Sequence, residues 1–241
     1  MKRPLIIGHK GAPEHELGNT LPSFKRAIEI GVDMIELDVQ ETKDAVLVVF
    51  HDWDLSNLSA SDAVIGEMAC ADIQDIELQG GYRIPTLDEV LDLAQGKTMV
   101  DIDIKGFDLG EKALQSVKSH DMVNDVLFTS FYHPQLQRIR ELEPEAEIGL
   151  LYSNPLEKPA SYTLELNAQV IAPLIDLFYP ALVAQAHNVG LKVIPWTVNS
   201  TDIAVELARL GVDGIITDVP DVFLSMYQKM DFSDTRDFAV T

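Results

Sequence analysis

The sequence has 241 residues, of which 46% are hydrophobic and 24% charged, a mixture that excludes an intrinsically disordered chain and suits one large domain. Aspartate and glutamate outnumber lysine and arginine by 39 to 18, a net charge of −21, which argues against nucleic acid and anionic membranes as partners. The single cysteine, Cys70, excludes an intrachain disulfide. No apolar run is long enough for a signal-peptide core or a transmembrane span, so we expect a cytoplasmic protein.

The chain begins with a pattern of strand, helix, strand. The apolar run Leu5–Gly8 predicts a short strand. Helical periodicity over Leu21–Ile30 follows, with Thr20 as a starting signal and Gly31 as a stop. Asp33–Gln40 then reads as a second strand.

The same alternation continues to the end of the sequence. Six further strands are predicted near residues 98–104, 125–131, 146–151, 169–173, 191–197 and 213–217. Helices are predicted near residues 86–95, 109–119, 134–142, 157–166, 176–188, 200–210 and 220–229. Eight alternating units predict an α/β fold, a closed (β/α)8 TIM barrel. A doubly wound open sheet is the less favoured alternative, because no glycine-rich dinucleotide turn follows the first strand.

One segment interrupts the alternation after the second strand. Ala45–Phe50 resembles an extra strand, and residues 54–84 are polar, acidic and weakly periodic. We interpret residues 54–84 as a small insertion within a single domain spanning residues 1–241. Insertions at that end of a barrel usually shape or cover the active site, although purely local packing is the alternative.

Reactive side chains gather at the predicted carboxyl ends of the strands, where barrel enzymes place their active sites. They are His9, Lys10, Glu36, Asp38, His51, Asp52, Asp103, Lys105, Ser130, Trp196 and Asp218. His9 and His51 lie near the carboxylate strand and are candidates for a general acid and a general base. The other four histidines are interpreted as structural or solvated.

The acidic residues predict a metal site. Glu36 and Asp38 are two apart on one strand and so share a face, and the same holds for Asp101, Asp103 and Lys105. Closely packed carboxylates need a proton, a cation or a metal to offset their repulsion. Oxygen-only ligands suit Mg²⁺ or Ca²⁺. The alternative is a set of ion pairs with lysine.

An ordered set of motifs resembles the glycerophosphodiester phosphodiesterase family across nearly the whole chain. The motifs are His9-Lys10-Gly11, Asn19-Thr20, Ile35-Glu36-Leu37-Asp38-Val39, Thr42-Lys43-Asp44, His51-Asp52, Ile84-Pro85-Thr86-Leu87, Asp103-Ile104-Lys105, Ser130-Phe131, Trp196-Thr197-Val198-Asn199 and Gly211-Val212-Asp213-Gly214-Ile215-Ile216-Thr217-Asp218. The order of these motifs is far more specific than any one of them.

This resemblance implies a metal-dependent barrel enzyme that cleaves glycerophosphodiesters to glycerol 3-phosphate and an alcohol. By matching position, it implies that His9 and His51 are the acid/base pair. It likewise implies that Glu36, Asp38 and Asp103 hold the metal, and that Lys105 and Lys10 bind phosphate. The aromatic face of Trp196 is a candidate surface for the glycerol backbone or the alcohol group.

The sequence departs from the family pattern at three positions. Lys10 stands where arginine is usual, Gly18 where glutamate is usual, and Asp103 where the longer glutamate is usual. These changes keep open a catalytically altered barrel that only binds a phosphorylated metabolite. A lysophospholipase D-like phosphodiesterase is a second alternative. A zinc hydrolase is disfavoured, because the first strand lacks that class's pair of histidines.

Overall fold

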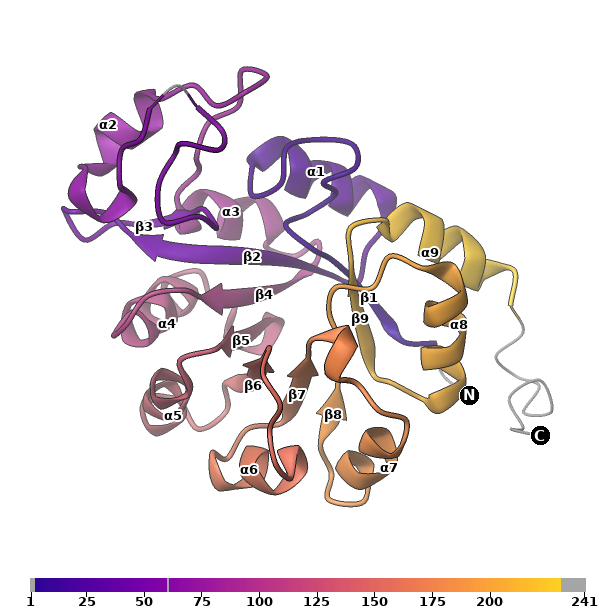
Figure 1. Ribbon diagram of the computed structural model, residues 1–241. Coiled ribbons are helices and arrows are strands. Elements are labelled where there is room, and N and C mark those ends of the chain that lie inside the picture. The colour runs from indigo at the N-terminus through magenta and orange to yellow at the C-terminus, as the bar shows by residue number, and fades with distance from the viewer. Residues whose placement is uncertain (1–2, 60, 231–241) are drawn as a thin grey trace.

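The computed structural model describes residues 3–59 and 61–230, and these residues form a parallel barrel surrounded by helices (Figure 1). The barrel strands are β1 (Leu5–Gly8), β2 (Met34–Glu41), β4 (Met99–Ile104), β5 (Val126–Ser130), β6 (Glu147–Tyr152), β7 (Val170–Pro173), β8 (Lys192–Val193) and β9 (Gly214–Thr217). Their order is β8-β7-β6-β5-β4-β2-β1-β9. The predicted TIM barrel is confirmed.

Helices cover the outside of this barrel (Figure 1). They are α1 (Leu21–Ile30), α3 (Leu87–Ala94), α4 (Gly110–Ser119), α5 (His133–Leu142), α6 (Pro159–Glu165), α7 (Ala181–His187), α8 (Thr201–Leu210) and α9 (Pro220–Gln228), while α2 (Cys70–Asp75) lies in the segment after an extra strand, β3 (Leu47–Val49). Short 3-10 helices span Ile65–Glu67, Val123–Asp125 and Ile175–Leu177. None of the helices in the described part of the chain has the length and apolarity needed to cross a membrane.

Irregular backbone bonds, rather than a ladder, close the barrel between β8 and β9. Asp213 N donates to Val193 O at 2.9 Å, and Ile216 N donates to Pro195 O at 3.1 Å. The predicted strand 191–197 is accordingly shorter than expected, because Pro195 has no N–H to contribute to a ladder. The predicted helix 176–188 begins later, at Ala181, since Pro180 disfavours helical geometry in the residue before it.

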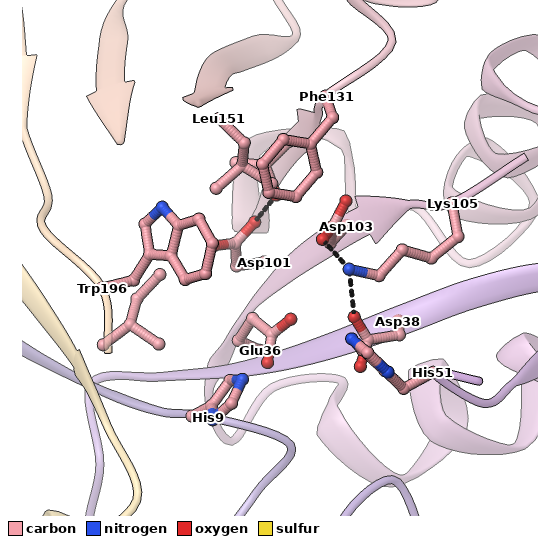
Figure 2. Close-up of a pocket in the computed structure, with 12 residues that line it drawn as sticks. His9, Glu36, Asp38, His51, Asp101, Asp103, Lys105, Phe131, Leu151 and Trp196 are labelled. Atoms are coloured by element: carbon pink, nitrogen blue, oxygen red, sulfur yellow. Dashed lines mark hydrogen bonds and ion pairs between the residues drawn. The ribbon is translucent and has the colours of Figure 1, made fainter. Parts of the chain in front are cut away.

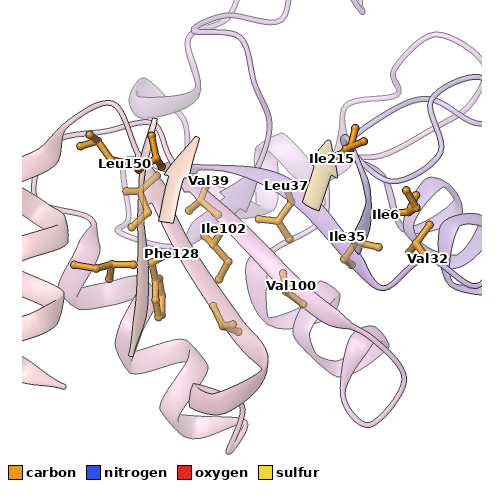
Figure 3. Close-up of a cluster of buried hydrophobic side chains, with 14 of the residues drawn as sticks. Ile6, Val32, Ile35, Leu37, Val39, Val100, Ile102, Phe128, Leu150 and Ile215 are labelled. Carbon is orange, nitrogen blue, oxygen red and sulfur yellow. The ribbon is translucent and has the colours of Figure 1, made fainter. Parts of the chain in front are cut away.

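Alternation along the strands sorts apolar and charged side chains onto opposite faces. Ile35, Leu37 and Ile102 point outward into the core between sheet and helices (Figure 3). The intervening acidic residues therefore point into the barrel. A smaller apolar cluster, which includes Ile7, Leu127, Val170, Ile194 and Ile216, fills the barrel interior beneath them.

The extra strand folds back on β2. β3 (Leu47–Val49) pairs antiparallel with β2, with Val49 opposite Val39. It is shorter than the predicted Ala45–Phe50, because Ala45 adopts a positive φ of 64° in the turn that reverses the chain. The following segment, which contains α2, packs around its own buried cluster of Val48, Phe50, Leu55, Ile65, Cys70, Ile73, Leu78 and Ile84.

Candidate active site

A cavity of about 130 Å³ opens at the carboxyl ends of the barrel strands (Figure 2). It is lined by His9, Glu36, Asp38, His51, Asp101, Asp103, Lys105, Thr129, Phe131, Leu151, Trp196 and Ile216. Eight residues were predicted to act as acid/base pair, metal ligands, phosphate ligands or aromatic surface. Seven of these eight therefore meet in one place, although they span most of the chain. The eighth, Lys10, lies beside the cavity without lining it.

Three buried carboxylates form the centre of the site. Glu36 and Asp38 come from β2 and Asp103 from the adjacent β4, where Asp38 is the register partner of Asp103. One oxygen from each lies within 4.8 Å of the others. Asp103 Oδ1 is buried with no hydrogen-bond partner among the described residues.

Lys105 supplies the positive charge nearest to these acids. Its Nζ lies 2.5 Å from Asp103 Oδ2 and 2.9 Å from Asp38 Oδ1, and 5.5 Å from the centre of the Phe131 ring. Figure 2 shows the ammonium group between the two aspartates. Burial would lower the pKa of Lys105, but the two carboxylates outweigh this and raise it, so Lys105 stays charged.

The acids outnumber the nearby lysines, and most of the acids accordingly have raised pKa values. Burial raises the pKa of Asp103 to about 7, against the lowering effect of Lys105. Burial also raises the pKa of Glu36, as does the charge of Asp38. Asp101, which lies beside them and accepts a hydrogen bond from Thr129 at 2.7 Å, has a pKa raised well above normal by burial and by Glu36. Of these four buried acids, only Asp38 has a lowered pKa, because its lysine neighbours outweigh its burial.

These residues fit a hard divalent cation. The donor set is three carboxylates, which are the ligands that Mg²⁺ and Ca²⁺ prefer. The unpartnered Oδ1 of Asp103 is a buried acceptor without a donor, and such an atom is costly unless a cation or donor reaches it. A bound cation would also offset the repulsion that raises the pKa values of Glu36 and Asp103.

His9 is held by a carboxylate from the last strand. Its Nδ1 lies 2.6 Å from Asp218 Oδ1, and Asn199 Nδ2 donates to the other Asp218 oxygen at 2.6 Å. Burial would lower the pKa of His9, but the bond to Asp218 and the charge of Glu36 outweigh it and raise the pKa. A carboxylate on Nδ1 leaves Nε2 as the nitrogen available to a substrate.

His51 is positioned in a similar way, beside Asp38, whereas His9 lies beside Glu36 (Figure 2). Its Nδ1 lies 2.7 Å from Asp52 Oδ1, and Asn57 donates to the other Asp52 oxygen at 2.9 Å. The buried amide of Gln40 donates to Phe50 O at 2.9 Å and to Asp52 O at 2.6 Å. The turn back from β2 into β3 and the Gln40 amide thus bring His51 to the level of Asp38.

Lys10 and Gly18 are neighbours, so two of the three departures from the family pattern fall at one contact. Lys10 N donates to Glu36 Oε2 at 2.8 Å, and its Nζ lies 3.8 Å from Asp38 Oδ2. A Cβ on Gly18 would lie 3.0 Å from Lys10 Cβ, so a larger residue would press on the lysine. Glu16 does not take the place of the glutamate missing at position 18, because its carboxylate accepts a hydrogen bond from the Tyr82 hydroxyl at 2.5 Å.

The remaining wall of the cavity is apolar. Trp196 lies edge-on to Phe131 with ring centres 5.6 Å apart, and its Nε1 donates to Ala172 O at 2.8 Å. Leu151 lies beside Phe131 (Figure 2). The cavity therefore has a charged half, from β1, β2, β3 and β4 and the residues that follow them, and an apolar half, from the ends of β5, β6 and β8.

Sequence patterns assigned no role to several side chains that hold the candidate site residues in place. Asp218 was recognised at a strand end but given no role, and Asn19 was assigned only to a motif. Asn19 Nδ2 in fact donates to Asp38 Oδ2 at 2.7 Å. Two patterns could have pointed to such partners. Barrel closure places the last strand beside the first, which brings Asp218 near His9, and the period of two along a strand puts Gln40 on the same face as Glu36 and Asp38.

Comparison with known proteins places the chain in a family. Residues 9–222 match the model of the glycerophosphoryl diester phosphodiesterase family. The chain is 34% identical over 240 residues to a glycerophosphodiester phosphodiesterase of Caldanaerobacter subterraneus, covering 94% of this chain and 99% of that protein. A putative glycerophosphoryl diester phosphodiesterase from Silicibacter pomeroyi superposes with a TM-score of 0.85 at 26% identity, covering 94% of this chain and 95% of that one.

A second solved structure extends the likeness in fold. An Oleispira antarctica phosphodiesterase, solved in complex with the product sn-glycerol-3-phosphate, has a TM-score of 0.86 at 23% identity, and the match covers 94% of this chain and 98% of that one. At that identity the likeness concerns the fold. The family match over most of the chain and the 34% identical relative show that this chain belongs to the glycerophosphoryl diester phosphodiesterase family.

Proposed function

We propose that this protein hydrolyses glycerophosphodiesters to glycerol 3-phosphate and an alcohol. The observation that carries the proposal is the convergence of two carboxylate-held histidines on a buried acidic cluster in one small cavity. Family membership supports the same reaction, as does the name of the Caldanaerobacter relative. The product bound to the Oleispira phosphodiesterase is the one this reaction would release.

Glu36, Asp38 and Asp103 would hold one divalent cation, Mg²⁺ or Ca²⁺. When bound, such a cation neutralises charge on the phosphoryl oxygens and so lowers the cost of attack at phosphorus. The shorter side chain of Asp103 bears on which ion binds, since Ca²⁺ tolerates irregular geometry that Mg²⁺ does not. Asn19, through its bond to Asp38, would fix the orientation of one ligand.

His9 and His51 would move the protons. Because a carboxylate occupies Nδ1 of each ring, each Nε2 can accept a proton from an attacking hydroxyl or donate one to the departing alcohol oxygen. His9 lies beside Glu36 and His51 beside Asp38 (Figure 2), so one ring could act on the attacking hydroxyl and the other on the departing oxygen.

Lys105 would bind the phosphate oxygens, with Lys10 contributing from the rim. Both ammonium groups now lie against Asp38, at 2.9 Å for Lys105 and 3.8 Å for Lys10. Their charge would stabilise the additional negative charge that develops on the phosphoryl oxygens in the transition state. Trp196 would offer its ring face to the glycerol carbons on the apolar side of the cavity.

The test is release of glycerol 3-phosphate from glycerophosphocholine by protein treated with EDTA and then resupplied with Mg²⁺, Ca²⁺ or Mn²⁺. We expect release only with metal, and a rise in melting temperature with the same ion, since a ligand at ~100 times its Kd stabilises by about 2.7 kcal/mol. Glu41→Gln is the matched control, because Glu41 ends β2 but pairs with Lys112 outside the cluster.

Two results would contradict the proposal. Full activity after chelation would show that the reaction does not need a metal. A melting temperature that rises with metal, without release of product from any glycerophosphodiester, would instead indicate a barrel that binds phosphorylated metabolites without cleaving them.

A further inference from the structure

Exposed aromatic side chains gather at one sector of the barrel mouth. Within residues 3–59 and 61–230, the exposed aromatics are Trp53, Phe107 and Tyr132, with 73%, 75% and 37% of their surface accessible. They follow β3, β4 and β5, and β2, which pairs with both β3 and β4, connects this sector of the sheet. Scattered exposed apolar residues are ordinary, but a group at the rim of a cavity indicates a contact with a ligand.

Phe107 and Tyr132 form an aromatic pair next to the active-site cavity. Their ring centres are 4.3 Å apart. Phe131, which precedes Tyr132, lines the active-site cavity, whereas Phe107 and Tyr132 line a second hollow of about 450 Å³ over the starts of α4 and α5. The pair thus lies directly outside the proposed reaction centre.

The loop that carries Phe107 is fixed in place from below. Gln135 is buried, and its Oε1 accepts hydrogen bonds from Leu109 N and Gly110 N, both at 3.1 Å. Its Nε2 donates to Gly106 O at 2.7 Å. This single amide ties the loop after β4 to α5. The backbone on either side of Phe107 is therefore fixed, with the Phe107 side chain exposed to solvent.

The sizes and charges of the two hollows differ in a way that limits what each can hold. The active-site cavity, about 130 Å³, lies below the ~300 Å³ at which pockets begin to enclose drug-sized ligands, whereas the second hollow lies within that range. A large substituent on the phosphate must therefore extend out of the active-site cavity across its rim. The described residues that line the second hollow include two carboxylates, Asp108 and Glu111, and one cation, Arg138, which is paired with Glu111 at 3.3 Å. An anionic substituent is therefore disfavoured there.

We propose that the hollow behind Phe107 and Tyr132 is a subsite for an apolar alcohol esterified to the substrate phosphate. The inference rests on the proposed phosphodiesterase function and adds to it the class of leaving alcohol, an alkyl chain long enough to pass the aromatic pair. Burial of that chain against the two rings would lower the free energy of the transition state for apolar esters.

The experiment measures kcat/KM for glycerophosphodiesters of n-alkanols from ethanol to octanol, below their micelle-forming concentrations. We expect kcat/KM of the wild-type enzyme to rise about tenfold from the ethyl to the octyl ester, a modest part of ~0.8 kcal/mol per fully buried methylene. Phe107→Ser combined with Tyr132→Ser should abolish this rise and leave the ethyl ester unchanged. Val222→Ser, an exposed apolar position on α9, is the control.

Other outcomes overturn the subsite. A chain-length dependence that persists in the double variant, or a parallel loss for the ethyl and octyl esters, would show that the pair does not select the alcohol. A dependence seen only with an acyl chain on the glycerol would place the chain on the other side of the phosphate. A choline ester favoured over every alkyl ester through these rings would assign them to a quaternary ammonium group. If no ester yields glycerol 3-phosphate, the proposed function itself fails.

Discussion

The two halves of the active-site cavity differ in what burial of their side chains costs. In the charged half, Glu36, Asp38, Asp101 and Asp103 are buried at the cost of desolvation and mutual repulsion, which raises three of their four pKa values. In the apolar half, Phe131, Leu151 and Trp196 pack as side chains do in any core. A costly arrangement of this kind persists where the fold holds groups ready for chemistry.

Removal of a histidine from the charged half should give the largest effect. We expect His9→Ala and His51→Ala each to lower kcat by about 100- to 10,000-fold, the usual contribution of acid/base catalysis, with little change in melting temperature. Steady-state hydrolysis of glycerophosphocholine and thermal unfolding would check this. His15→Ala is the matched control, since His15 lies on the same loop as His9 but pairs with Asp221 outside the cavity.

Near-normal turnover in either variant would show that the charged half does not work through these histidines. A large loss in His15→Ala would point instead to a general effect of altering the loop between β1 and α1.

Sequence patterns captured the barrel and most of the charged half. Alternation within β2 and β4 predicts that Glu36, Asp38 and Asp103 face the barrel interior, and pairing of neighbouring strands brings them together. The position of His51 could not be predicted so directly, because it depends on a turn with Ala45 in a left-handed conformation and on the Gln40 amide.

Long-range partners were the other limit of sequence reasoning. The contact between His9 and Asp218 joins residues 209 positions apart, and it exists only because β9 lies beside β1 in the closed barrel. The second hollow could not be predicted either, since the exposure of Phe107 follows from hydrogen bonds made by Gln135. No local pattern marks a glutamine as the residue that ties a neighbouring loop to its helix.

Asp218→Asn should have an intermediate effect and should shift the pH dependence. Asp218 raises the pKa of His9, so its neutral replacement should lower that pKa. The limb of the kcat/KM profile that reports His9 should therefore move to lower pH, whichever direction His9 transfers its proton. Activity at the optimum should fall about 10- to 100-fold, as is typical for partners that orient a functional histidine. A uniform fall with both limbs in place would contradict this role. Asn199→Ala should lower activity at the optimum by less than Asp218→Asn does, because Asn199 orients Asp218 through a bond to its other oxygen.

Changes in the apolar half should be the smallest and should act on binding. Trp196→Leu removes the aromatic face, so we expect KM for glycerophosphocholine to rise about two- to tenfold with kcat little changed, in line with ~0.5–1.5 kcal/mol for an aromatic contact. Trp196→Phe keeps a ring face while losing the bond to Ala172 O, and should restore most of the affinity. If Trp196→Leu instead lowered kcat as strongly as His9→Ala while KM stayed constant, the apolar half would stabilise the transition state, and the division between a charged half for chemistry and an apolar half for binding would be wrong.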